Sequence, residues 1–124
     1  MLPGCGALTV TNNIIMGGLT GIDVSGMLTG TIDHNNLWAN SREDYAEQAV
    51  TWRGAHNLAA DPLLISVQAG DLHLAQGSPC IDAGDARAAP LTDIDGDPRP
   101  QGRAPDIGAD ERGAWTLWLP ALRR

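Results

Sequence analysis

Acidic residues recur at alternating positions near the end of the chain, in the stretch TDIDGDPRPQ. Asp93, Asp95 and Asp97 would place several carboxylate oxygens around one turn, and Ca²⁺ prefers oxygen ligands. The pattern departs from an EF-hand loop, because Pro98 stands where that loop needs glycine and Ala104 where it needs a bidentate glutamate. Two interpretations stay open: a calcium site formed by the three aspartates, and a turn stabilised by Asp side chains.

Two histidines form a second set of residues with the chemistry of a site. His34 and His56 are 22 residues apart, and Asp33 and Asp61 lie near them in sequence. In a chain that winds with this period, the two imidazole rings would stack. A metal or acid/base site needs at least three converging groups, which the spacing does not guarantee. The alternative is that these are polar residues at the corners of the chain.

Three aromatic residues lie around an acidic segment in the middle of the chain. Trp38, Tyr45 and Trp52 would together form a platform for sugar rings, as on carbohydrate-binding surfaces. The alternative places Trp38 in the core, because it repeats the apolar position of Ile15. Glycosidases use a pair of carboxylates, but a chain with 15 acidic residues contains such pairs by chance. The sequence therefore names no catalytic residue.

The balance of charges excludes several classes of function. The eight basic residues are all arginine and the net charge is -7, which opposes binding to nucleic acid phosphates. Chemistry that needs a lysine is excluded. Cys5 and Cys80 form no CxxC pair, so they are either two buried thiols or one disulfide. The apolar stretch 114–122 is far shorter than the ~20 residues that span a bilayer, and we expect no membrane span.

A weak internal repeat predicts how these residues are positioned. TVTNNII at residues 9–15 returns as IDHNNLW at 32–38, an offset of 23, and HNLA at 56–59 is a third echo. This period predicts stacked turns of short parallel strands. Asparagine tolerates the left-handed backbone of a tight corner, and stacked Asn side chains form a hydrogen-bonded ladder. Residues 40–50 lack a strand pattern, and we expect a protruding loop or a one-turn helix there.

The end of the chain resembles a known family. The stretches HNLAADPLL, GDLHLAQGSPCIDAGD and DIDGDPRPQGRAPDIGADE closely resemble the C-terminal part of bacterial surface proteins with a right-handed parallel β-helix of the pectate-lyase-like kind and a choice-of-anchor type tail. The resemblance covers residues 8–111. It implies an all-β fold, a right-handed parallel β-helix (solenoid) of about three coils plus a C-terminal capping tail. It also implies an extracellular or cell-surface location, and Ile81 and Ile107 in a closing core. Asp110 departs from the family, which usually has an aromatic residue there, and further N-terminal coils are missing.

These observations predict three regions: β-helix coils over 1–69 with the loop at about 40–50, closing strands and turns over 70–113, and an apolar and basic tail over 114–124. An open first coil needs a cover, which upstream coils or self-association would supply. In the second case Trp115, Trp118 and Leu119 of the tail would pack on another copy. A head-to-tail contact gives a filament and a two-fold contact a dimer.

The sequence thus predicts a non-catalytic, extracellular structural or adhesive module that self-assembles and contacts a polysaccharide. The alternative is a polysaccharide lyase or hydrolase of the same fold. Calcium is the one cofactor that the sequence suggests.

Overall fold

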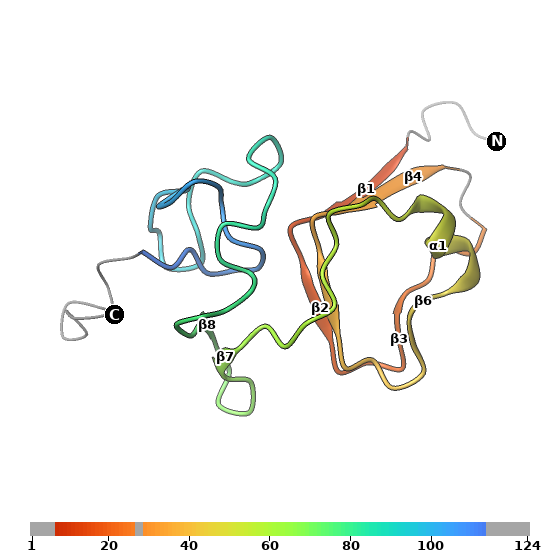
Figure 1. Cartoon of the computed structure of the whole chain (residues 1–124), viewed down its shortest axis with the longest axis horizontal. Coiled ribbons are helices and arrows are strands. Elements are labelled where there is room, and N and C mark those ends of the chain that lie inside the picture. The colour runs from red at the N-terminus through yellow and green to blue at the C-terminus, as the bar shows by residue number, and fades with distance from the viewer. Residues whose placement is uncertain (1–6, 27–28, 114–124) are drawn as a thin grey trace.

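The computed structural model describes residues 7–26 and 29–113. Figure 1 shows two halves side by side, an N-terminal half that ends near residue 62 and a C-terminal half of turns that follows it. The N-terminal half passes twice through three short strands. The first passage contains β1 (Leu8–Thr11), β2 (Ile14–Met16) and β3 (Thr20–Ile22), and the second contains β4 (Gly30–Asp33), β5 (Asn36–Trp38) and β6 (Glu43–Tyr45). Each strand pairs in parallel with its counterpart one passage later.

The prediction of a right-handed parallel β-helix of about three coils with a capping tail is wrong. Every sheet in the described residues has only two strands, so the sheets do not form the predicted solenoid. The third passage contributes two isolated bridges, at Arg53 and Leu58. Beyond it, β7 (Leu64–Ser66) and β8 (Asp71–Leu74) pair antiparallel. Pro62 stands four residues after Leu58, and a proline, which has no N–H to donate, does not continue a ladder of hydrogen bonds.

The register of the parallel pairs also corrects the predicted repeat. The pair β3–β6 has an offset of 23, with Thr20 opposite Glu43. In the pairs that contain the repeated sequence, however, Leu8 lies opposite Gly30 and Ile14 opposite Asn36, an offset of 22 residues. The ladder of asparagines explains the difference. Only an offset of 22 aligns Asn13, Asn35 and Asn57, and this alignment makes a run of three asparagines.

The predicted asparagine ladder is confirmed. The backbone N–H and the side-chain amide of Asn13 donate to Asn35 Oδ1 at 3.0 and 3.1 Å. Asn35 donates in the same way to Asn57 Oδ1 at 3.0 and 3.2 Å. The left-handed corner lies one residue earlier, at Asn12 (φ 63°) and His34 (φ 58°). The ladder therefore holds the three passages together at one edge.

The segment expected as a loop or a one-turn helix contains both a strand and a helix. Residues 43–45 form β6, and α1 (Glu47–Trp52) follows it. Tyr45 pairs with Ile22 and packs against the core of the N-terminal half. The charged residues around it hid this strand, because a three-residue strand shows too little alternation to be recognised.

Two clusters of buried side chains form the core of the protein. The first, inside the N-terminal half, contains Ile22, Val24, Ile32, Leu37 and Ala49. The second contains Leu74, Cys80 and Ile107, with Ile14 and Leu58 of the N-terminal half packed against it. The predicted burial of Ile107 is confirmed at 0% exposure, and Ile81 packs beside it, partly buried. Cys80 is a free, buried thiol, while Cys5 lies outside the described residues.

One asparagine joins the start of the chain to the C-terminal half. The amide of Asn12 donates to the Asp85 carbonyl at 3.0 Å, and the Asp85 N–H donates back to Asn12 Oδ1 at 2.7 Å. The Asn12 carbonyl accepts a further bond from Gly108 at 2.9 Å. The second core cluster and this reciprocal pair together dock one half on the other.

Candidate functional site

The aspartates predicted to bind calcium organise a turn. Asp93 Oδ1 accepts the N–H groups of Asp95 and Asp97, both at 2.9 Å, and Asp93 Oδ2 accepts that of Glu111 at 2.7 Å. Partial burial opposes ionisation of Asp93, but these backbone bonds hold the pKa of its carboxyl below the usual value. The three carboxylates do lie within 4.8 Å of one another. The hydrogen bonds nevertheless account for the position of Asp93, as the turn interpretation expects.

Two buried carboxylates, which the sequence did not reveal, join the closing segments between residues 82 and 112. Asp106 Oδ1 accepts the Asp82 N–H at 2.8 Å, and its Oδ2 accepts that of Arg112 at 2.7 Å. Glu111 Oε1 accepts the Asp106 N–H at 2.9 Å, and its Oε2 accepts that of Gln101 at 3.0 Å. All four carboxylate oxygens are thus acceptors for the backbone. In the sequence, the DIGADE stretch shows only acidic residues among small ones. This pattern is equally typical of an exposed turn, so it does not reveal that the carboxylates are buried.

Arg99 and Asp110 complete this network. The Arg99 side chain is buried; its Nη2 donates to the Gly108 carbonyl at 2.9 Å, and its Nε lies 3.7 Å from Glu111 Oε1. Asp110 Oδ2 accepts the Leu74 N–H at 2.9 Å. Asp110, the residue at which this chain departs from the family pattern, therefore binds the segment around residue 110 to β8.

His73 is clamped between two carboxylates. Its Nδ1 lies 2.6 Å from Asp71 Oδ1, and its Nε2 lies 2.5 Å from Asp95 Oδ2. Partial burial disfavours a charged ring, but the bonds to Asp71 and Asp95 and the charge of Asp110 raise the pKa of His73 above its usual value. A protonated ring donates from both nitrogens, so the charged form links β8 to the turn at residue 95.

The pKa values predict that the protein is less stable at neutral than at mildly acidic pH. Burial raises the pKa of Asp106 from 3.8 to about 6, so the folded state binds a proton more tightly than the unfolded state. Stability from this group falls as pH rises between these two values, by about 3 kcal/mol. The raised pKa of His73 acts in the same direction at higher pH, because its stabilising charge is lost as pH rises through the folded pKa.

Urea unfolding at about pH 5 and about pH 8 measures the part of this difference that lies above pH 5, about 1.4 kcal/mol for Asp106. We expect the higher midpoint at pH 5. Asp106→Asn should flatten the slope below about pH 6, and His73→Gln the slope above it. A midpoint that rises steadily from pH 5 to pH 8 would contradict the assignment.

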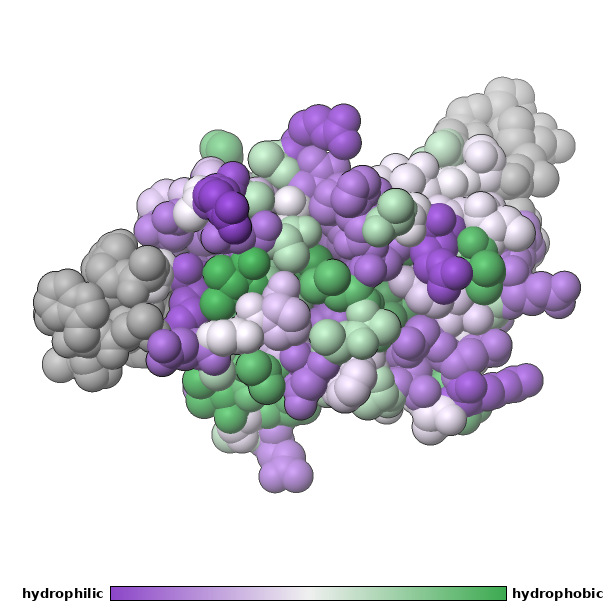
Figure 2. Space-filling model, viewed as in Figure 1, coloured by the Kyte–Doolittle hydropathy of each residue, from purple (hydrophilic) through white to green (hydrophobic). Residues whose placement is uncertain are grey.

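A groove of about 610 Å³ runs between the two halves. Figure 2 shows apolar residues gathered across the middle of the face of the molecule that Figure 1 presents. Apolar side chains from β2, the β7–β8 hairpin and the turns that follow make up most of the lining, among them Ile14, Met16, Val67, Leu72 and Ile94. The ionisable residues in the lining are Asp93 and Arg99, and both bond to the backbone. The groove offers an apolar surface but no free acid/base pair among its lining residues.

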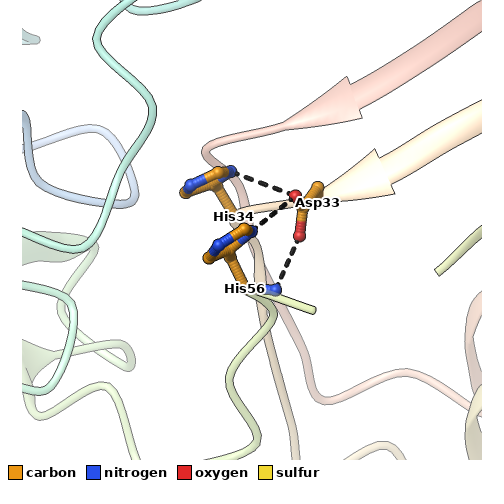
Figure 3. Close-up of side chains that lie close together, drawn as sticks. All are labelled: Asp33, His34 and His56. Atoms are coloured by element: carbon orange, nitrogen blue, oxygen red, sulfur yellow. Dashed lines mark hydrogen bonds and ion pairs between the residues drawn. The ribbon is translucent and has the colours of Figure 1, made fainter. Parts of the chain in front are cut away.

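The two histidines converge with one aspartate at the edge of the N-terminal half (Figure 3). Their rings stack with centroids 4.5 Å apart and an interplanar angle of 10°, as the spacing predicted. Asp33 Oδ2 lies 2.9 Å from His56 Nδ1 and 3.5 Å from His34 Nδ1. Asp61 is not part of this group, because its Oδ1 accepts the Leu63 N–H. Three groups therefore meet where the spacing alone left convergence open.

The three aromatic residues of the predicted glycan platform are not presented as one surface. Tyr45 and Trp52 pack against the first core cluster, and the Arg53 guanidinium lies 5.0 Å from the centre of the Tyr45 ring. Trp38 pairs with Met16 and is 36% exposed. Leu37 takes the buried position opposite Ile15 that the alternative gave to Trp38.

The tail residues proposed for self-association, Trp115, Trp118 and Leu119, lie outside the described residues. Among residues 7–26 and 29–113, no helix has the length and apolar character needed to cross a bilayer. In comparisons with protein-family models, curated proteins and solved structures, none matches this chain.

Proposed function

We propose that this chain is a non-catalytic structural module of an extracellular or cell-surface protein. The observation that carries the proposal is the use of the C-terminal carboxylates. Asp93, Asp106 and Glu111 direct both oxygens to backbone N–H groups. A carboxylate that acts as a general acid, a general base or a nucleophile must face the substrate, whereas these three are committed to holding loops.

The same network explains how the closing segments between residues 82 and 112 stabilise the C-terminal half. It joins segments around residues 82, 93, 101 and 106–112 into one unit, and Ile107 of this unit belongs to the second core cluster. A chain rich in turns has little regular hydrogen bonding of its own, and buried charge-assisted bonds replace it. A rigid closing unit of this kind suits a protein that bears load or presents a surface outside the cell. The resemblance of the tail to bacterial surface proteins supports the same location.

Incubation with pectin, alginate and xylan, with and without Ca²⁺, tests the absence of catalysis. We expect no new reducing or unsaturated ends beyond those in a heat-denatured control. Release of either kind of end would favour the polysaccharide lyase or hydrolase alternative. For the location, an antibody raised against the chain should label intact cells of the source organism. Labelling only after the cells are opened would contradict an external position.

A further inference from the structure

We propose that Asp33, His34 and His56 form a binding site for a divalent transition-metal ion of the Zn²⁺, Cu²⁺ and Ni²⁺ class. The proposal goes beyond the structural role and does not depend on it. Two imidazoles with one carboxylate suit these ions better than Ca²⁺ or Mg²⁺, which take oxygen ligands. Three protein ligands leave a fourth position for water.

The ligand atoms already face one point. Both Nδ1 atoms lie within 3.5 Å of the same oxygen, Asp33 Oδ2. Figure 3 shows the two rings turned the same way, with one nitrogen of each ring directed at the carboxylate. An ion between them would replace the direct contacts with three metal–ligand bonds. The net charge of -7 favours the approach of a cation.

The carboxylate is held in place from two sides. Its other oxygen, Oδ1, accepts the His56 N–H at 2.8 Å. A Cβ at Gly54 would lie 2.5 Å from Asp33 Cγ, so glycine is needed there for the carboxylate to fit. Partial burial opposes ionisation, but the bonds from the His56 side chain and backbone, together with His34, hold the pKa of Asp33 below its usual value. The carboxylate is therefore charged at neutral pH, and the bond from the His56 N–H orients it.

Binding requires a small adjustment of the histidines. The ligand atoms lie within 4.8 Å of one another, while Zn–N bonds are about 2.0 to 2.1 Å long. His56 has a side chain that is 65% exposed, so its ring is free to tilt toward the ion. His34 is more buried and has a left-handed backbone, with φ of 58°. The site thus combines one fixed ring with one adjustable ring.

Titration calorimetry with Zn²⁺ and electron paramagnetic resonance with Cu²⁺ test the proposal. The protein should carry no affinity tag, and Cys5→Ser should be present to remove the thiol nearest the N-terminus. We expect one ion per chain and nitrogen hyperfine structure from two imidazoles. His34→Asn keeps the backbone, since Asn12 occupies the equivalent corner with φ of 63°. This variant and His56→Gln should each weaken binding by about tenfold or more, because even the loss of a group that only hydrogen-bonds to a metal ligand costs that much.

His73→Gln is the matched control. The chain has three histidines, and His73 already contacts carboxylates through both ring nitrogens. Zn²⁺ affinity should be unchanged in this variant, with folding checked by circular dichroism. The proposal is overturned if the parent chain binds no ion, if the His34→Asn and His56→Gln double variant binds as well as the parent, or if His73→Gln abolishes binding.

Discussion

Replacing Glu111 with alanine is expected to destabilise the protein by about 3 to 5 kcal/mol, the range for removing one partner of a buried ion pair. The substitution leaves the buried Arg99 guanidinium without its carboxylate, which lies 3.7 Å away. It also removes the acceptors of the Asp106 and Gln101 N–H groups. Unsatisfied buried donors add to the loss, so the effect should be among the largest of any single substitution in this chain.

Urea unfolding at a fixed pH measures the change, and Glu43→Ala is the control. Glu43 forms a carboxylate–guanidinium contact of 3.9 Å with Arg42, but both side chains are exposed. A surface pair of this kind is worth about 0 to 1 kcal/mol. If Glu111→Ala and Glu43→Ala shift the midpoint equally, the buried network does not hold the C-terminal half together.

Ile107→Ala should cost about 2 to 5 kcal/mol, as expected for truncation of a buried isoleucine. Ile107 is fully buried beside Leu74 and Cys80, and its N–H donates to the Cys80 carbonyl at 2.9 Å. The N–H groups of the neighbouring Asp106 and Gly108 are also hydrogen-bonded. Because these bonds limit how far the backbone can move into the cavity left by the truncation, we expect a loss of stability in the upper part of this range.

Ile94→Ala provides the comparison of the same chemical change at an exposed position. Ile94 is 62% exposed and lines the groove, so its truncation should fall within about 0.5 kcal/mol of zero. The difference between the two variants isolates the contribution of burial. Equal, small effects would mean that the second core cluster does not stabilise the C-terminal half.

Local features with a repeated sequence could be predicted, and features set by distant contacts could not. The asparagine ladder follows from equal spacing, because stacked amides need only a common period. The offset was misjudged by one residue, since neighbouring asparagines at 12, 13 and 35, 36 allow two alignments and only Asn57 decides between them. The restriction of each parallel sheet to two strands was not predicted, because the third passage repeats the asparagine but makes only single bridges, at Arg53 and Leu58.

The candidate site shows the same division. The stacking of His34 and His56 follows from their spacing, but the contact with Asp33 depends on the backbone at His34 and on the space beside Gly54. The buried roles of Asp106 and Glu111 were missed because an acidic residue in a turn looks the same in sequence whether it faces water or accepts backbone bonds. Burial of Ile107 was predicted from the resemblance of the DIGADE stretch to a closing motif, and not from the local pattern of residues.

The reciprocal bonds between Asn12 and Asp85 bear on the order of events during synthesis. The two residues are separated by 73 positions in the chain. When β1 to β6 have left the ribosome, the amide of Asn12 and the apolar face of Ile14 still lack their partners. Closure of this long loop must wait for the C-terminal half and slows folding. The newly made N-terminal half therefore spends an interval with an open edge, and protection of that edge during translation becomes a requirement for productive folding.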